Sequence, residues 1–475
     1  AYRGCGQDPL KAIAAFTGTL EGSYGFCILF ADRPGEIYAV RKVSPLVASY
    51  THSGALVASD LTALISYTRE YFVVPEGCIV RLTPYKVRVY DMDFNRVEPE
   101  TLEVSWNMDA AMKNGYPHFM LKEIHEQPKA VKDTLGSVIK DNCIDLSSVE
   151  LTEDEIRGFD QIYIVACGSA WHVGMAAQYV IEDLADIPVR VELASEFRYR
   201  KMPVNQKALV IVVSQSGETA DTLAALRLAK EKGIMTLAVV NVVGSSIARE
   251  ADKVFYTLAG PEISVATTKA YSAQLAAMYC LAVEFAKVRG KITDEQYSYY
   301  ISELLTIPEK MQKVLEDKER IQWFAAKYAN AHDVFFVGRG IDYAVCLEGS
   351  LKLKEISYIH SEAYAAGELK HGTISLIEQG TLVIGVLTQS ELYEKTISNM
   401  LECKSRGAYL MGLTTYGKYE TEDQVNFTVY VPKVDEHFVG SLAVIPLQLL
   451  GYYVSVAKGL DVDKPRNLAK SVTVE

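Results

Sequence analysis

At 475 residues the chain is long enough for roughly two to four domains. Its 48 basic and 60 acidic residues give a net charge of −12, which disfavours a general nucleic-acid or membrane-surface binder, and no apolar run approaches the roughly 20 residues that a membrane helix needs. The eight cysteines are scattered without a C-x-x-C pair, so we expect reduced thiols in a cytoplasmic protein and no metal site.

Residues 1 to about 100 are predicted to be rich in β-structure. The runs 24–30 and 77–82 are apolar or alternating and are bounded by turn residues. The polar stretch 105–150 is predicted to be partly helical and to link domains. A helix beginning near His118 is expected to be interrupted at Pro128, because proline lacks the amide proton that a helix needs.

From residue 160 onwards the sequence alternates between strand and helix. Strands are predicted at 161–166, 188–193, 208–213 and 236–240, and helices at 168–184 and 220–232. Because the strands are apolar without alternation, they favour parallel sheets covered on both faces, in an α/β protein. A helical stretch over about 270–330 leads to a second region of this kind, which extends from Asp333 to about 460 and is followed by a polar tail.

The two α/β regions carry matched landmarks in the same order, which indicates duplication. Ser216 and Ser390 stand 174 residues apart, each shortly after an apolar strand, and Gly168 and Gly340 stand 172 apart. The copies differ where chemistry is expected. The first has a hydroxyl-rich turn, whereas the second has Glu391 where the first has Gly217, and a carboxylate there would repel phosphate.

The hydroxyl-rich turn follows a buried strand and leads into a helix. Ligands of open α/β sheets bind at the carboxyl ends of strands, where amides at a helix start attract anions. An ordinary helix cap would use the same residue types. The density of hydroxyls, together with Ser169 in a similar turn, favours a phosphate site formed by Ser214, Gln215, Ser216 and Thr219.

The second copy carries ionisable residues that the first lacks. Lys352 and Glu355 are three residues apart on one helix face, which alone indicates a solvated ion pair. His371 lies in a glycine-flanked turn, and a carboxylate with an imidazole beside a phosphosugar would suit an aldose–ketose proton transfer. Lys470 would be a plain exposed lysine unless the tail folds back over the site, where its amine could attack a ketone.

Five motifs resemble the glutamine–fructose-6-phosphate aminotransferase (isomerizing) family, over essentially the whole chain. They are 194–200 (ASEFRYR), 214–219 (SQSGET), 351–360 (LKLKEISYIH), 362–372 (EAYAAGELKHG) and 465–475 (PRNLAKSVTVE), of which the last is very specific. The resemblance implies an α/β fold with two tandem, doubly wound SIS (sugar isomerase) domains with parallel sheets at 153–293 and 325–466. A truncated α+β class II glutaminase (Ntn-type) domain at 1–85, a linker at 86–152 and a catalytic tail at 467–475 would complete it.

The resemblance also implies an activity, in which ammonia from glutamine reaches fructose 6-phosphate and glucosamine 6-phosphate is formed without a cofactor. Members are homodimers. By motif match, the substrate would be bound by the residues of the hydroxyl-rich turn, Ser214, Gln215, Ser216 and Thr219, together with Ser169, Val265 and Ala469. Lys470 would form an imine with the ketose, and Glu355 would move a proton between C1 and C2, with Lys352 nearby. His371 would assist ring opening, and the family's dimer would let it serve the neighbouring subunit's site.

Two departures from the family pattern affect these expectations. Ala170 stands where many members carry a second hydroxyl. Cys5 does not match the motif of the family's N-terminal nucleophilic cysteine, so we expect residues 1–475 not to hydrolyse glutamine. The alternatives are a sugar-phosphate-binding regulatory SIS module without turnover, and another SIS phosphosugar isomerase or deglycase.

Overall fold

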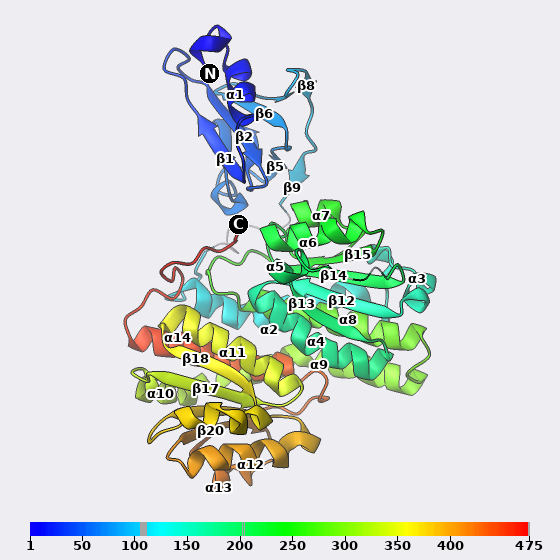
Figure 1. Cartoon of the computed structure of the whole chain (residues 1–475), viewed down its shortest axis with the longest axis vertical. Helices are drawn as coiled ribbons and strands as arrows, with labels where there is room; N and C mark the ends of the chain where they lie inside the picture. Colours follow the sequence, from blue (N-terminus) through cyan, green and yellow to red (C-terminus); the bar gives the residue numbers. More distant parts are fainter. Residues whose placement is uncertain (105–111, 202, 204, 474–475) are drawn as a thin grey trace.

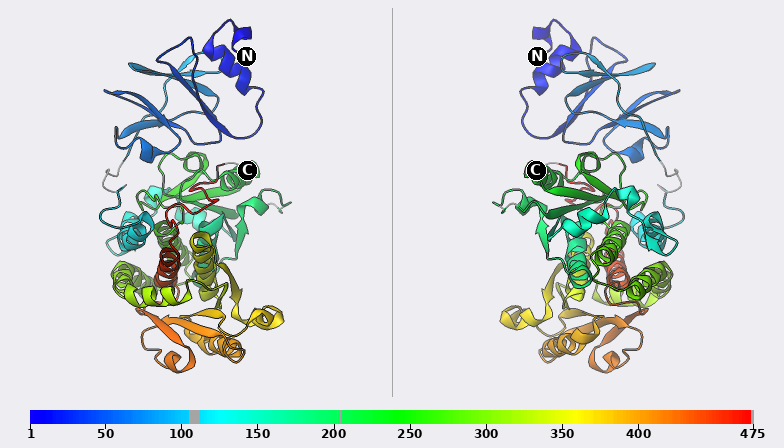
Figure 2. Two further views of the ribbon diagram at one scale, coloured as in Figure 1. Left: turned by 90° about the vertical axis from the view of Figure 1, so that its left-hand side faces the viewer. Right: turned by 90° about the vertical axis from the view of Figure 1, so that its right-hand side faces the viewer.

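The computed structural model describes residues 1–104, 112–201, 203 and 205–473 of the chain. A β-rich part occupies one end of the molecule, and two α/β domains are stacked below it (Figure 1). Figure 2 gives the same order from two further sides, with the C-terminal tail lying near the boundary between the β-rich part and the first α/β domain.

The β-rich part holds two antiparallel sheets and the helix α1 (Pro9–Thr17). One sheet has the order β1-β2-β6-β7-β8, with β1 Tyr24–Ile28, β2 Ile37–Lys42, β6 Cys78–Thr83, β7 Lys86–Asp91 and β8 Arg96–Val97. The other has the order β4-β3-β5-β9, with β3 Val47–Thr51, β4 Gly54–Ala58, β5 Glu70–Val73 and β9 Leu102–Glu103. Because β7 pairs with β6, the expected boundary at residue 85 falls inside a hairpin, and the β-rich part continues to Glu103.

Helix α2 (Phe119–Val138) continues through Pro128, so the predicted interruption is wrong. Proline leaves the carbonyl of Ile124 without its usual amide partner, but the side-chain Nε2 of Gln127 donates to that oxygen at 3.0 Å. Met120, Ile124 and Val131 are fully buried on one face of α2. The helix is therefore part of the packed α/β body, although it lies within the expected linker 86–152.

The first α/β domain has a parallel sheet of order β13-β12-β14-β15-β16. Its strands are β12 Gln161–Ala166, β13 Val189–Leu193, β14 Ala208–Ser214, β15 Met235–Val240 and β16 Lys253–Tyr256, and its helices include α3 Glu153–Gly158, α4 Gly168–Ala185, α5 Ala194–Phe197, α6 Ala220–Glu231 and α7 Ser246–Glu250. The strand order reverses between β12 and β14, which is where ligands bind in open α/β sheets.

The second domain repeats this sheet with the order β18-β17-β19-β20-β21, again parallel, as the duplicated sequence predicts. Its strands are β17 Asp333–Gly338, β18 His360–Ala365, β19 Leu382–Leu387, β20 Tyr409–Thr415 and β21 Phe427–Val431, and its helices include α11 Ile341–Ser357, α12 Tyr393–Lys404, α13 Thr421–Gln424 and α14 Gly440–Ala457. Helices α8 (Lys269–Val288), α9 (Asp294–Glu316) and α10 (Lys318–Tyr328) connect the copies, within the predicted helical stretch.

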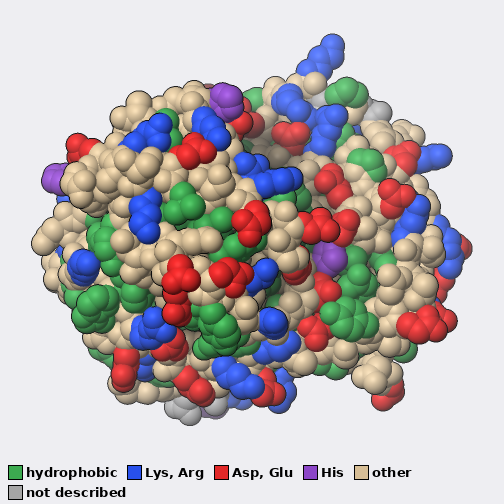
Figure 3. All heavy atoms as spheres, turned by 90° about the horizontal axis from the view of Figure 1, so that it is seen from below, with side chains coloured by type: hydrophobic (Ala, Val, Ile, Leu, Met, Phe, Trp, Pro, Cys, Tyr) green, Lys and Arg blue, Asp and Glu red, His purple; other side chains and the backbone are tan. Residues whose placement is uncertain are grey.

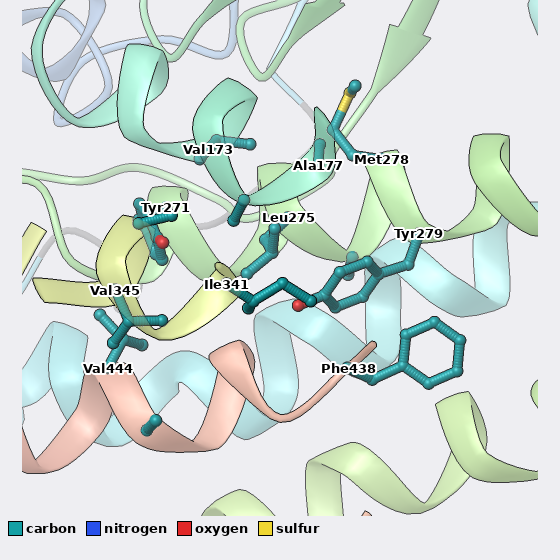
Figure 4. Close-up of a cluster of buried hydrophobic side chains, with 14 of the residues drawn as sticks. Val173, Ala177, Tyr271, Leu275, Met278, Tyr279, Ile341, Val345, Phe438 and Val444 are labelled. Atoms are coloured by element: carbon teal, nitrogen blue, oxygen red, sulfur yellow. The ribbon is translucent and has the colours of Figure 1, made fainter. Parts of the chain in front are cut away.

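The two copies share one hydrophobic core. Figure 4 shows side chains from α4, α8, α11 and α14 packed together, among them Val173, Leu275, Tyr279, Ile341 and Val444. Each of these side chains is buried. Because the core runs continuously between the copies, the helices that join the domains fix the position of α11 relative to the sheet of the first copy.

Among the described helices, α14 is long and apolar enough to cross a membrane by composition, but 89% of that segment is buried inside the protein, as in a core helix. Figure 3 shows the end of the molecule formed by the second copy, where acidic and basic side chains are interspersed.

Candidate functional site

The hydroxyl-rich turn lies where β14 ends and α6 begins, at the predicted place. The amide of Gly217 donates to Ser214 Oγ at 3.0 Å, and the amide of Glu218 donates to Ser216 Oγ at 3.2 Å. Ser214 Oγ lies 3.1 Å from Thr219 Oγ1. Gly217 has a φ of +67°, which favours glycine, and a Cβ there would lie 2.0 Å from Ser245 Oγ. The turn is thus a tight loop lined with hydroxyls at the start of a twelve-residue helix.

The C-terminal tail lies directly on this loop. Ser471 Oγ is 3.0 Å from Ser216 Oγ, and the carbonyl of Val472 accepts from the amide of Ala220, the first residue of α6, at 3.1 Å. The tail therefore folds back onto the first copy, which was the condition for a role of Lys470. Residues 474–475 of the predicted tail lie outside the described residues.

Lys470 points into the first copy and is held by two oxygen atoms. Its Nζ lies 2.6 Å from Glu262 Oε2 and 2.7 Å from the carbonyl oxygen of Ser264, and its side chain is 29% exposed. Glu262 Oε1 accepts from the amides of Thr268 and Ala270 at the start of α8. Burial opposes the ionisation of Glu262, but the nearby Lys470 ammonium and these amides hold its pKa below the usual value.

Asp463 anchors the first part of the tail. Its two carboxylate oxygens accept from the amides of Phe119 and Met120 at 2.9 and 2.8 Å, which caps the start of α2. Its carbonyl accepts from the amide of Val265 at 3.0 Å, so Val265 lies beside the tail rather than apart from it. Ala469, next to Lys470, is exposed.

Lys352 is fully buried, so the expectation of a solvated ion pair is wrong. Its Nζ lies 2.7 Å from Glu355 Oε2, 3.5 Å from Glu348 Oε1 and 3.0 Å from Ser169 Oγ. Burial alone would lower the pKa of Lys352, but the carboxylates of Glu348, Glu355 and Glu262 raise it above the usual lysine value. Glu262, which contributes to this rise in the pKa of Lys352, is the same carboxylate that binds Lys470.

Ser169 links the two copies at this cluster. Its hydroxyl donates to Glu348 Oε1 at 3.0 Å, and His172 Nδ1 lies 2.8 Å from the other oxygen of Glu348. Ser169 and His172 belong to α4 of the first copy, whereas Glu348 belongs to α11 of the second. Glu355 is 20% exposed by side chain and is the carboxylate of this group that keeps access to solvent.

His371 is not brought together with the other candidates. It ends the short 3-10 helix η5 (Ala366–His371) after β18, and it is exposed. Within the described part of the chain, it makes no hydrogen bond or ion pair with Lys352, Glu355 or Lys470.

The corresponding loop of the second copy is filled by carboxylates of the protein itself. Asp342 accepts from the amides of Thr388 and Gln389 at 2.8 and 3.2 Å and from the Thr388 hydroxyl. Glu436 Oε1 accepts from the amide of Ser390 at 3.1 Å. Glu391 is exposed, so the acid that excludes an anion from this loop is Asp342 rather than Glu391.

Sequence reasoning missed Glu262, Glu348 and Ser471. Glu348 could have been found, because it stands four residues before Lys352 and seven before Glu355, on the same helix face. Glu262 and Ser471 have no such local signal, since their partners are more than two hundred residues away. Among the described residues no group of three or more His, Cys, Asp or Glu side chains is arranged to hold a metal ion.

Comparison with known proteins gives the same organisation. The SIS domain family matches residues 155–284 and 327–458. The chain is 51% identical over 475 residues to a glutamine–fructose-6-phosphate aminotransferase (isomerizing) of Clostridium tetani, spanning 78% of that protein, and 44% identical over 458 residues to one of Methanosarcina acetivorans, spanning 74% of it.

Solved structures place the same fold on the two α/β domains. The C-terminal domain of glucosamine-fructose-6-phosphate aminotransferase from Francisella tularensis matches with a TM-score of 0.72 and 40% identity, over 74% of this chain and all of that one. A glucosamine-6-phosphate deaminase from Thermotoga maritima matches with a TM-score of 0.59 and 24% identity, over 74% of this chain and 99% of that one, and this shows the fold alone.

Proposed function

The chain belongs to the glutamine–fructose-6-phosphate aminotransferase (isomerizing) family, and from this premise we propose that its two SIS domains convert fructose 6-phosphate and ammonia to glucosamine 6-phosphate. The observation that carries the proposal is the position of the tail. Ser471 contacts the serine loop at Ser216, and the adjacent Lys470 enters the first copy beside Glu262.

The serine loop is proposed to bind the phosphate group. Ser214, Ser216 and Thr219 supply hydroxyl donors, Gln215 lies beside them, and the α6 amides add a favourable dipole. The Ala220 amide now donates to the Val472 carbonyl. A phosphate that used this amide would replace the Val472 carbonyl, so binding is coupled to a shift of the last tail residues.

Lys470 is proposed to form an imine with the open-chain ketose. The amine must first lose a proton, and the adjacent Glu262 carboxylate is the nearest acceptor, at 2.6 Å. The neutral amine adds to the C2 carbonyl and water leaves. Val265 and Ala469, which lie beside and within the tail, are proposed to line the sugar site.

Glu355 is proposed to carry the proton between C1 and C2. It is the solvent-accessible carboxylate of the buried cluster, whereas Glu348 is wholly buried and bound to Ser169 and His172. Lys352 neutralises both carboxylates and donates to Ser169. Glu355 is therefore the carboxylate of this cluster that can reach a bound sugar, and it is proposed as the base.

His371 is proposed to assist ring opening in the site of a second copy of the chain. It is exposed and lies away from the other candidates of its own chain, so its action there needs a partner in a homodimer. Sedimentation analysis tests the dimer. Mixing a His371→Ala chain with a Lys470→Ala chain tests the sharing: restored activity requires that each site draws residues from both chains.

The first 103 residues are proposed to belong to a class II glutaminase domain, in keeping with the family. Cys5 lies in the 3-10 helix Arg3–Cys5 and not in the nucleophile's motif.

The test measures glucosamine 6-phosphate formed from fructose 6-phosphate with ammonium or with glutamine. The proposal expects product from ammonium, lost in Lys470→Ala and kept in Lys464→Ala, which removes an exposed lysine of the same tail. Binding of fructose 6-phosphate without product in the unsubstituted chain would contradict the proposal and favour a sugar-phosphate-binding regulatory module.

A further inference from the structure

Glu123 is a buried carboxyl group behind the Lys470 site that none of the proposed steps uses. It lies on α2 and is 1% exposed. Its Oε1 accepts from the amides of Ile263 and Ser264 at 2.5 and 3.2 Å. Its Oε2 is also buried and has no hydrogen-bond partner among the residues that the structure describes. Burial of a polar atom without a partner costs free energy of folding. A carboxyl group at this position therefore suggests a functional role.

The segment that Glu123 holds is the one that holds Lys470. Glu262 immediately precedes Ile263, and its carboxylate binds Lys470 Nζ. The Ser264 carbonyl binds the same Nζ at 2.7 Å. The two oxygens that orient the amine therefore flank the two amides that Glu123 binds. A displacement of this segment would move both oxygens together.

We propose that Glu123 is a positioning residue for Lys470, whose carboxyl oxygen holds the 262–264 segment and, through it, the two oxygens that orient the Lys470 amine. This inference rests on the proposed imine step and deepens it. Glu123 touches neither the amine nor the ketose and acts through Glu262 and Ser264.

The environment of Glu123 acts on its own ionisation. Burial and the neighbouring Glu262 carboxylate raise the pKa of Glu123 to about 8, while the positive charges of Lys470 and Lys269 oppose the rise. Ionised or neutral, the carboxyl group keeps the oxygen that accepts from the amides of Ile263 and Ser264.

Imine formation needs the Lys470 nitrogen in a defined position. The nitrogen, once it has released a proton, adds to the carbonyl carbon, and the oxygen then leaves as water. A displacement of the 262–264 segment would move the two oxygens that orient the amine, and it should therefore slow imine formation.

The experiment traps the imine with borohydride, which reduces it to a stable secondary amine that mass spectrometry locates on Lys470. Three variants are compared with the full chain over pH 6 to about 10, a range that brackets the ionisation. Glu123→Gln keeps an acceptor oxygen but cannot ionise. Glu123→Ala removes the acceptor. Asp133→Asn removes an exposed carboxylate from the same helix and serves as the control.

The proposal expects Glu123→Ala to trap about tenfold more slowly at pH 7, as the loss of hydrogen bonds in a buried site implies, with fructose 6-phosphate binding unchanged. Glu123→Gln, which keeps an acceptor oxygen for the two amides, should trap within about threefold of the unsubstituted rate at pH 7. Asp133→Asn should match the unsubstituted chain in both respects.

Trapping by Glu123→Ala at the unsubstituted rate would overturn the positioning role, and so would a loss in Glu123→Gln as large as in Glu123→Ala. If Glu123→Ala does not fold, Glu123→Gln decides, and a loss of tenfold or more in its trapping rate overturns the proposal. Absence of any adduct in the unsubstituted chain is a separate result, because it refutes the imine step itself.

Discussion

Ser471 and Ser216 are joined by a hydrogen bond of 3.0 Å between their hydroxyl groups, although 255 residues separate them in the chain. One hydroxyl belongs to the tail and the other to the loop at the start of α6. The bond closes the tail over the loop beside Lys470, and it occupies a group that the loop would otherwise offer to a ligand.

The two serines should therefore respond differently to truncation. Ser216→Ala removes a phosphate donor and is expected to weaken fructose 6-phosphate binding by tenfold or more, since a hydrogen bond to a charged group contributes about 1.5–3 kcal/mol. Ser471→Ala removes only the competing contact, so affinity should stay equal or rise. Titration calorimetry with each variant measures both. Equal losses in the two variants would contradict this division of roles.

Gly217 should be sensitive to a single added carbon. Gly217→Ala combines a backbone φ of +67° with a Cβ 2.0 Å from Ser245 Oγ, so the loop must distort and phosphate binding is expected to be lost. Gly233→Ala is a matched control, because its φ is +69° but a Cβ would meet nothing within 4 Å. Gly233→Ala should lower stability by about 1 kcal/mol and leave binding intact. Calorimetry and thermal unfolding measure the two effects.

Asp463 should affect both stability and activity. Asp463→Ala uncaps α2, which typically costs about 0.5–2 kcal/mol, and it also frees the tail segment that leads to Lys470. We expect a lower thermal midpoint together with reduced product formation. Asp461→Ala, which removes an exposed carboxylate two residues earlier, should be milder because it binds only tail amides. Retention of full activity in Asp463→Ala would show that the tail is anchored elsewhere.

The carboxylate in the loop of the second copy should appear in the pH dependence of stability. Burial raises the pKa of Asp342 to about 6, although the Thr388 hydroxyl and the loop amides oppose the rise. Because this pKa is raised above the unfolded value, the contribution of Asp342 to stability is greatest below about pH 4 and is lost as the pH rises through about 6. Asp342→Asn should remove this loss of stability. The difference in thermal unfolding midpoint between the variant and the unsubstituted protein should therefore change between about pH 4 and 6. An unchanged difference would contradict the assignment.

The doubly wound architecture was predictable because the strands of each copy are short apolar runs between turn residues. Strand β14 and helix α6 lie within a residue of their predicted ends. The interruption at Pro128 was mispredicted because the side chain of Gln127 replaces the missing backbone donor, and no rule about proline alone includes that contact.

The site was predictable only in part, since spacing reveals neighbours on one helix but not contacts between distant segments. Lys352 and Glu355 were found as a pair, yet their burial depends on Ser169 and α4, from the other copy. Glu123 binds the amide of Ile263, next to Glu262, which binds Lys470, and these contacts between distant segments are defined only by the tertiary structure.

The cluster of Ser169, Glu348 and Lys352 draws its members from both copies, and the tail crosses from one copy to the other. The two sheets keep the same strand arrangement, whereas the loops after β14 and β19 differ, because Asp342 binds the loop amides of the second copy. Since the cluster and the tail contacts each need residues of both copies, we expect that neither copy retains them when the other is removed.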